Sequence, residues 1–486
     1  MTRRYLVSAG LTILLGAAVV TAQRPGPARN GGEGGAESRD MRLVGHSDLQ
    51  GRSAYQPEIR RQGDRWIAYV GHHGGSGMNP LTGREEPNGT SIVDVTDPRN
   101  PKYLAHIPGQ PLEPGGTAES GGAQMVRICS GATLPRADKT KTYLLRAYGN
   151  TANSAHEMWD VTDPSKPTRI NVIVSGLRGT HKSWWECDTG IAYLVSGQPG
   201  WRVPRMAKIY DLSDPAKPVF IRDFGLPGQQ PGSTGTPPGD NGLHGPVSLP
   251  QQNRVYFAYG FVRDGVVQIV DREKLLNGPK EPTEANLLYP QISRMDMPPS
   301  VGAHNVFPLL RMPIAAFAKE AESVRDMLVI VDEAIGGGCK ATARAMMWIA
   351  DITTETKPFG ASNWTVPEAS GNFCERGGRF GTHASHENFT PIYYNRIMFV
   401  AHFNAGIRAV DVRDPFQPKE IAYYIPALGP TTFCTPGGNN LPCVKVIQTN
   451  NVEVDDRGYI YGADRAGSGM HIVELTGAAR AVANFR

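Results

Sequence analysis

The chain has 486 residues, of which 40% are hydrophobic and 20% charged, an ordinary globular composition with enough length for a buried core. Its 50 basic and 46 acidic residues give a net charge of +4, and no basic run or stacking motif is present, which argues against nucleic acid as a partner. The 56 glycines and 39 prolines suit a protein in which many short strands are joined by turns.

The N-terminus is typical of an export signal. Arg3 and Arg4 precede an apolar stretch, 6–20, that is too short to span a bilayer comfortably, and small residues at 20–22 offer a cleavage point. We therefore expect residues 1–22 to be a signal peptide and the Gly-rich residues 23–40 to be a disordered linker. An ordinary secretory signal and a twin-arginine signal both fit this pattern.

The mature protein is accordingly expected to be exported, either periplasmic or secreted. No later stretch of about 18 apolar residues follows, so no transmembrane segment is expected in the mature chain.

Seven short strands with a common ending recur along the rest of the chain. Each ends in an acidic residue, and an Asp-Pro pair usually begins three residues after that acid. The acids of successive repeats lie 51 to 80 residues apart. A roughly regular period with one β-unit per repeat predicts a propeller or a solenoid. Because Asp in a turn bonds the local backbone, we interpret the acids as structural. They are Asp94, Asp160, Asp211, Asp271, Asp351, Asp411 and Glu474.

The third repeat can be divided into four strands. A strand begins at His181, and three more are predicted at 191–195, 207–212 and 219–223. Four antiparallel strands of about five residues make a propeller blade. We therefore predict that residues 41–486 form an all-β, seven-bladed β-propeller of four-stranded antiparallel blades. Its ring needs closure, and either 41–45 or 478–485 could supply the closing strand.

The repeated strands resemble those of the LVIVD-repeat family. The resemblance is carried by Val-Asp-Val-Thr-Asp-Pro at 93–98, by Ile-Val-Asp at 269–271 and by their counterparts, and it covers about residues 41–477. It implies a β-propeller in an exported or surface protein. It implies little about activity, because propellers host many unrelated functions.

Six cysteines in an exported chain favour disulfide bonds. Cys434 and Cys443 flank a turn-rich loop, so we assign a disulfide between these two before the others. Cys339 with Cys374 and Cys129 with Cys187 complete one of the fifteen possible connectivities.

The first strand of each predicted blade begins with a polar residue. First strands line the central channel of a propeller, so these residues are expected to face its axis. Four consecutive repeats place a histidine at this position, and the other three place an amide. The histidines are His181, His244, His304 and His386, and the amides are Gln56, Gln124 and Asn450.

Further histidines are expected at the same end of the channel, in loops beside these strands. They are His72, His73, His383 and His402. Because imidazole is the commonest transition-metal ligand, this end could hold one Cu, Fe or Zn ion. The predicted ligands are His181, His244, His304 and His386, with His383 and His402 as auxiliary groups and Glu387 as a ligand or base. The alternative is a ring of histidines bonded to water and loop carbonyls, which the same pattern permits.

Two other motifs have competing interpretations. By strand alternation, one of Trp184 and Trp185 packs in the core, and the other could line the bottom of a ligand pocket. Core packing of both is the favoured interpretation. Asp332 and Glu333, before the glycines 336–338, are interpreted as a loop tip because no Gly-Lys-Ser follows.

Two functions remain open from the sequence. The first is an exported binding or scaffold protein that recognises a protein, a glycan or a small molecule through its loop-rich face. The alternative is a metal-dependent oxidoreductase with Cu, Fe or Zn at the histidine-rich mouth. No Gly-x-Ser-x-Gly motif is present, so a serine hydrolase has no support.

Overall fold

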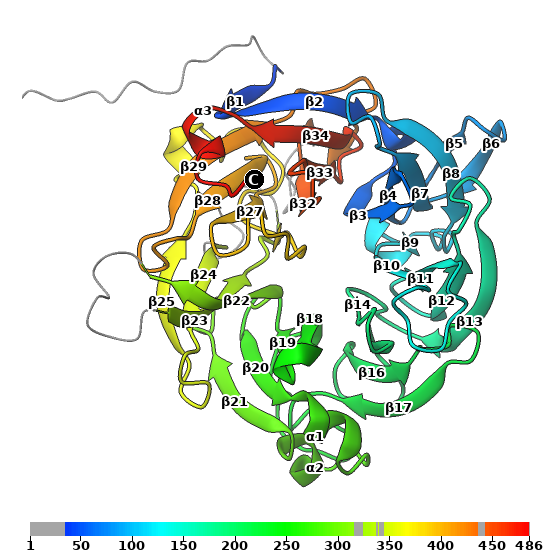
Figure 1. The fold of residues 1–486 in the computed structure, drawn as a ribbon, viewed down its shortest axis with the longest axis vertical. Coiled ribbons are helices and arrows are strands. Elements are labelled where there is room, and N and C mark those ends of the chain that lie inside the picture. Colours follow the sequence, from blue (N-terminus) through cyan, green and yellow to red (C-terminus); the bar gives the residue numbers. More distant parts are fainter. Residues whose placement is uncertain (1–34, 315–323, 337–338, 340–344, 436–442, 486) are drawn as a thin grey trace, which may run out of the picture.

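The computed structural model describes residues 35–314, 324–336, 339, 345–435 and 443–485. Seven antiparallel sheets surround a central axis, which confirms the predicted seven-bladed propeller (Figure 1). The predicted signal peptide 1–22 and most of the predicted linker lie outside the described residues. Within the described ranges, no helix has the length and apolarity that a bilayer crossing needs.

Each blade has four strands, counted from the channel outward. Blades one to four comprise β3 (Ala54–Gln62), β4 (Arg65–His73), β7 (Gly89–Asp94) and β8 (Lys102–Pro108); β10 (Val126–Ser130), β11 (Thr142–Tyr148), β12 (Ser154–Asp160) and β13 (Thr168–Leu177); β14 (Trp184–Trp185), β15 (Ile191–Ser196), β16 (Met206–Asp211) and β17 (Val219–Phe224); and β18 (Leu243–Leu249), β19 (Arg254–Tyr259), β20 (Val266–Asp271) and β21 (Gln291–Asp296).

Blades five to seven repeat the plan. They comprise β22 (Asn305–Pro313), β23 (Val324–Val331), β24 (Met347–Asp351) and β25 (Phe359–Trp364); β26 (Ala384–Ser385), β27 (Ile397–Ala401), β28 (Ile407–Asp411) and β29 (Lys419–Ile425); and β32 (Thr449–Val454), β33 (Ile460–Asp464), β34 (Gly469–Leu475) and β2 (Met41–Ser47).

Shorter elements decorate this ring. They are β5 (Ser76–Asn79), β6 (Arg84–Pro87), β9 (Gly122–Ala123), β30 (Cys434–Thr435), β31 (Val444–Lys445), α1 (Arg272–Asn277), α2 (Glu284–Leu288) and α3 (Gly477–Arg480). Helices α1 and α2 stand between the last two strands of blade four, at the lower edge of the ring in Figure 1. They explain why that repeat lacks the Asp-Pro ending, since Asp271 accepts from the backbone N–H of Lys274 at the start of α1.

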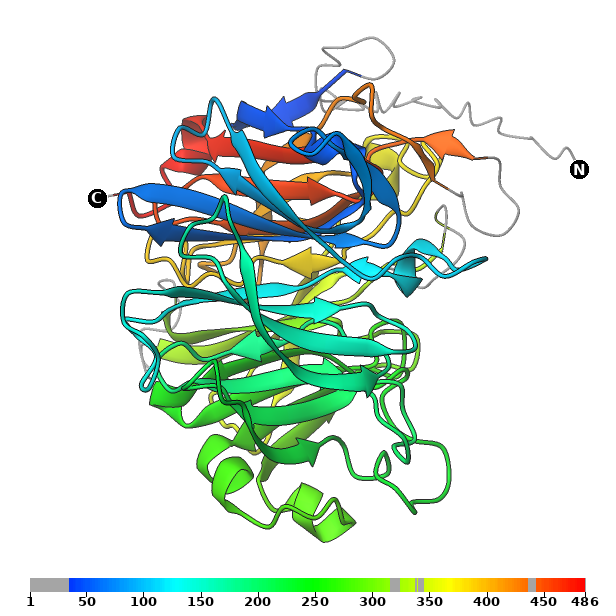
Figure 2. The same ribbon diagram turned by 90° about the vertical axis from the view of Figure 1, so that its right-hand side faces the viewer.

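The N-terminal strand closes the ring. β2 pairs antiparallel with β34, from Met41 opposite Leu475 to Ser47 opposite Met470, so the N-terminal segment supplies the outermost strand of the last blade (Figure 2). The alternative segment 478–485 forms part of α3 and the turn after it. β1 (Glu37–Arg39) adds a fifth strand to blade six beside β29, so the end of the predicted linker is paired backbone.

Apolar side chains fill the space between neighbouring blades. Seven buried clusters occupy the seven blade interfaces, for example the cluster of Phe307, Val329 and Met398 between blades five and six. Both faces of each sheet are therefore covered, which explains why strands such as β27 are apolar at every position.

The repeated acids have the predicted structural role. Asp94, Asp160, Asp211, Asp351 and Asp411 end a third strand, and each accepts a backbone N–H from the second residue after it, at 2.8 to 3.0 Å. Glu474 instead pairs with Arg42 of the closing strand. The three predicted disulfides, Cys129–Cys187, Cys339–Cys374 and Cys434–Cys443, are all present.

Candidate functional site

Three histidines occupy equivalent positions at the channel mouth. The backbone N–H groups of His181, His304 and His383 each bond to a carbonyl near the end of the second strand of their own blade, at 2.8 to 3.0 Å. His244 lies at the start of β18 in the blade between the first two. Consecutive blades three to six therefore each present one imidazole to the axis.

These imidazoles form a ring with one tyrosine. Ring centroids lie 4.4 Å apart for His181 and His244, 3.7 Å for His244 and His304, and 4.4 Å for His304 and His383. Tyr55 of blade one completes the circle, 5.2 Å from His181 and 5.8 Å from His383. All five side chains are buried.

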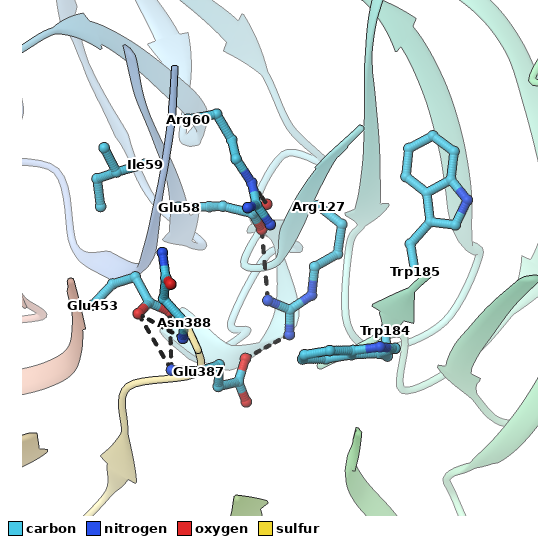
Figure 3. A pocket seen from close by; sticks show the side chains of 9 residues that line it. All are labelled: Glu58, Ile59, Arg60, Arg127, Trp184, Trp185, Glu387, Asn388 and Glu453. Carbon is cyan, nitrogen blue, oxygen red and sulfur yellow. Dashed lines mark hydrogen bonds and ion pairs between the residues drawn. The ribbon is translucent and has the colours of Figure 1, made fainter. Parts of the chain in front are cut away.

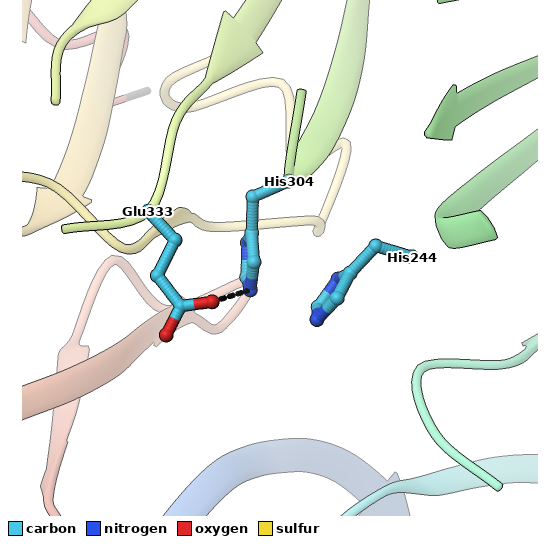
Figure 4. Close-up of side chains that lie close together, drawn as sticks. All are labelled: His244, His304 and Glu333. Atoms are coloured by element: carbon cyan, nitrogen blue, oxygen red, sulfur yellow. Dashed lines mark ion pairs between the residues drawn. The ribbon is translucent and has the colours of Figure 1, made fainter. Parts of the chain in front are cut away.

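Glu333 reaches this ring from the loop after β23. Its Oε2 lies 3.7 Å from Nε2 of His304, and its Oε1 lies 3.7 Å from Nε2 of His383. One potential ligand atom from each of His244, His304 and Glu333 lies within 4.8 Å of the others, which makes them a group that could hold a metal ion (Figure 4).

Several nitrogens of the ring have no hydrogen-bond partner among the described residues. They are Nδ1 of His181, Nδ1 of His244 and both nitrogens of His304. Nδ1 of His383 bonds to the carbonyl of Asn450 at 2.5 Å, so the proton belongs on Nδ1 and the lone pair of Nε2 is free. Such a carbonyl contact is the usual way in which a protein orients a metal-binding imidazole.

The local electrostatics favour neutral imidazoles. Burial lowers the pKa of His181, His244, His304 and His383 well below the ordinary value, and neighbouring positive charges lower it further. Burial raises the pKa of Glu333 to about 7, although Arg379 at 3.0 Å opposes that rise. At neutral pH the imidazole lone pairs are therefore available to a ligand.

The structure does not bring His386 and His402 to the ring. His386 packs between blades five and six, 5.2 Å from Phe307, and its Nδ1 accepts from the backbone N–H of Phe399. The alignment of blade six is wrong by three residues, because His383 makes the backbone bond that defines this position. His402 faces away from the ring, with its imidazole 4.8 Å from Phe380.

Glu387 also has a different role from the predicted ligand or base. It forms ion pairs with Arg127 at 2.6 Å and Lys182 at 2.8 Å, and it accepts from Nε2 of Gln56. These cations hold the pKa of Glu387 at about 2 against the opposing effect of burial. Glu387 and its partners form a buried charge network, which lies further along the first strands than the histidine ring.

A cavity of about 40 Å³ lies beside this network (Figure 3). Arg127 reaches across it, with its guanidinium 4.8 Å from the ring of Trp184 and its Nη1 3.5 Å from Glu58. Trp185 is buried in the interface between blades two and three. The favoured packing of both tryptophans in the core therefore holds only for Trp185, whereas the half-buried Trp184 lines the cavity, as the alternative expected.

Sequence reasoning missed Tyr55 and Glu333. Tyr55 precedes Gln56, the residue chosen for blade one, and a one-residue shift exchanges the two faces of a strand. Glu333 was assigned to a loop tip, but its backbone N–H bonds to the carbonyl of Phe261 and its side chain is 7% exposed. The available signal was an acidic pair directly after a second strand, which is a mouth-facing position.

No protein-family model and no curated protein matches the sequence. Among solved structures, the chain is similar to Sqt1 from Chaetomium thermophilum, with 9% identity and a TM-score of 0.45 over 90% of this chain and 99% of that one. The β-propeller domain of Cps50 (Swd1) from Myceliophteria thermophila is 9% identical, with a TM-score of 0.45 over 87% and 97% of the chains.

A third similar structure is a hypothetical selenium-binding protein from Sulfolobus tokodaii. It is 14% identical, with a TM-score of 0.47 over 78% of this chain and 79% of that one. Likenesses at this level of identity concern the fold and carry no argument about activity.

Proposed function

We propose that this chain is an exported β-propeller binding protein whose channel mouth holds one transition metal ion, either Cu, Fe or Zn. His244, His304 and Glu333 are the proposed ligands, and His383 is the fourth donor within reach. The signal-like residues 1–22, the three disulfides and the resemblance to the LVIVD-repeat family support export.

The convergence of three donor atoms within 4.8 Å carries this proposal. Two donors that bind one ion at about 2.0–2.2 Å lie at most about 4.4 Å apart. Small rotations of the side chains would therefore bring the present arrangement to ligand distances. Two imidazoles and one carboxylate form a donor set used by both zinc and non-haem iron sites.

The unpaired nitrogens of His304 give a second argument. A buried polar group without a partner costs about 1–3 kcal/mol, and His304 has two such atoms at 0% exposure. Coordination would remove part of that cost. The competing explanation is that water in the channel bonds to these nitrogens. It predicts that the stability of the protein does not depend on an added metal ion.

The charge beneath the ring does not exclude a cation. The ammonium of Lys182 adds positive charge near His244, His304 and His383. It is paired with Glu387 at 2.8 Å, so its field at the mouth is partly cancelled. Glu333 supplies the negative charge next to the proposed ligands.

A metal-dependent oxidoreductase is the second candidate. The observation that favours it is the number of ligands, because three protein donors leave a position open, as in catalytic sites. A reversible one-electron wave from the Cu- or Fe-loaded protein, absent from a His304→Leu variant, would support it. A loaded protein that is silent in voltammetry would leave only the binding function.

Metal content tests the proposal directly. We would measure the metal-to-protein ratio after loading and gel filtration for wild type, His304→Leu and His402→Leu. His402 is the matched control, since it is equally buried and neither of its nitrogens has a hydrogen-bond partner in the described ranges, but it lies outside the ring. We expect about one equivalent in wild type and His402→Leu and none in His304→Leu. A wild type without metal, or equal losses in both variants, would contradict the proposal.

A further inference from the structure

Arg205 stands beside the histidine ring, and it is held there by an amide and an aromatic ring. Its guanidinium lies 5.5 Å from the centre of the Phe261 ring, and Phe261 lies 5.4 Å from His244. Its Nη2 donates to Oδ1 of Asn150 at 3.2 Å. Arg205 forms no ion pair with any carboxylate in the described part of the chain, and its side chain is only half-buried.

The two other arginines at the mouth are already neutralised. Arg379 pairs with Glu333 at 3.0 Å, and Arg465 pairs with Glu119 at 2.5 Å. Three arginines thus face two carboxylates around one ring. Their surplus positive charge is located at Arg205.

Arg205 lies close to the same rings that form the proposed metal site. Its positive charge is among the causes that lower the pKa of His181, His244 and His304. A small ligand in contact with Arg205 would therefore lie next to these rings. The guanidinium offers a planar fork of donors, which suits a carboxylate or a phosphate.

We infer that the channel mouth binds a small oxyanion of carboxylate or phosphate type, held by Arg205 next to the ring of His181, His244 and His304. The inference deepens the proposed function and rests on it for the second contact, in which another oxygen of the anion faces the metal site. The uncompensated guanidinium alone provides the first contact, so an anion should also bind the metal-free protein, though more weakly.

Calorimetric titration with malonate and with inorganic phosphate tests this inference in metal-free and Co²⁺-loaded protein. We expect at least one of the two anions to bind wild type, at least about tenfold more tightly after loading. Arg205→Met should weaken binding at least about tenfold in both states. Arg205→Lys, which keeps the charge but loses the fork, should weaken it less.

Arg178→Met is the matched control, because Arg178 is an exposed arginine in the loop that leads to His181 and its one described side-chain hydrogen bond is to a carbonyl. It should bind the anion like wild type. Equal affinities of wild type and Arg205→Met, or no binding of either anion in both states, would overturn the inference. Failure to take up Co²⁺ would instead overturn the proposed function, and the metal-free titrations would still decide the role of Arg205.

Discussion

Two layers of polar side chains cross the central channel, and they differ in how their groups are paired. In the layer further along the first strands, Glu387 is held by Arg127, Lys182 and Gln56. In the layer at the mouth, among the described residues, His304 has two nitrogens without a hydrogen-bond partner and Arg205 bonds to the Asn150 amide but forms no ion pair. The paired layer is suited to hold the blades together, whereas the unpaired layer is suited to bind a ligand.

The largest expected effect is in the paired layer. Glu387→Gln leaves two buried cations without their carboxylate, so the free energy of unfolding should fall by about 3–5 kcal/mol. Chemical denaturation measures this change. Glu355→Gln is the control, because its pair with Arg254 is partly exposed and should be worth at most about 1 kcal/mol. Equal losses in both variants would show that the network does not support the fold.

Glu453 gives the paired layer a predicted pH dependence. Burial and the neighbouring Glu387 raise the pKa of Glu453 to about 8, above its ordinary value of 4.5. The folded state thus keeps a proton that the unfolded state releases above about pH 4.5. The stability from this group is complete below that pH and is lost as the pH rises through about 8.

Glu453→Gln should flatten that part of the profile. Unfolding free energies between pH 5 and 9 should decline less in the variant than in wild type, by at most about 4 kcal/mol, since each pH unit between 5 and 8 contributes at most about 1.4 kcal/mol. Parallel profiles would show that Glu453 is ionised in the folded protein at neutral pH.

Removal of the carboxylate at the mouth should weaken metal binding and leave the fold intact. Glu333→Gln replaces a charged ligand by a neutral amide, so we expect at least about a tenfold loss of affinity, or 1.4 kcal/mol, by competition with a chelator. Glu119→Gln is the control, because Glu119 pairs with Arg465 and is not one of the converging ligands. An equal loss in both variants would indicate only a general effect of mouth charge.

The smallest expected effect concerns Tyr55. Its hydroxyl lies 3.1 Å from Nε2 of His181, so Tyr55→Phe should cost about 1 kcal/mol of stability. Metal affinity should change by less than about threefold, because His181 is not among the three converging ligands. A larger loss of affinity would place His181 in the coordination shell.

The propeller and three of its channel histidines were predictable because they follow the repeat. His244 lies at the start of a first strand, and His181 and His304 lie just before one, at the channel end of their blades. His383 and His386 were not distinguishable in this way, since they flank a strand of only two residues, β26. Their assignment depends on a backbone bond across the blade, which no local pattern reveals.

Residues from loops were the least predictable part of the site. Glu333 and Arg205 lie in loops of different blades, after β23 and after β15. Their approach to the ring follows from how the blades close around the axis, and closure by β2 involves pairing across more than 420 residues. The pairing of Glu387 with Arg127 and Lys182 has the same origin, because each comes from a different blade.

The most direct test of the proposed metal site is an anomalous diffraction measurement on crystals of the protein loaded with Zn²⁺ or Co²⁺. We predict one strong anomalous peak at the channel mouth, at bonding distance from His244, His304 and Glu333. The absence of a peak there, together with peaks only at surface residues, would contradict the account and leave the histidine ring as a water-filled polar channel.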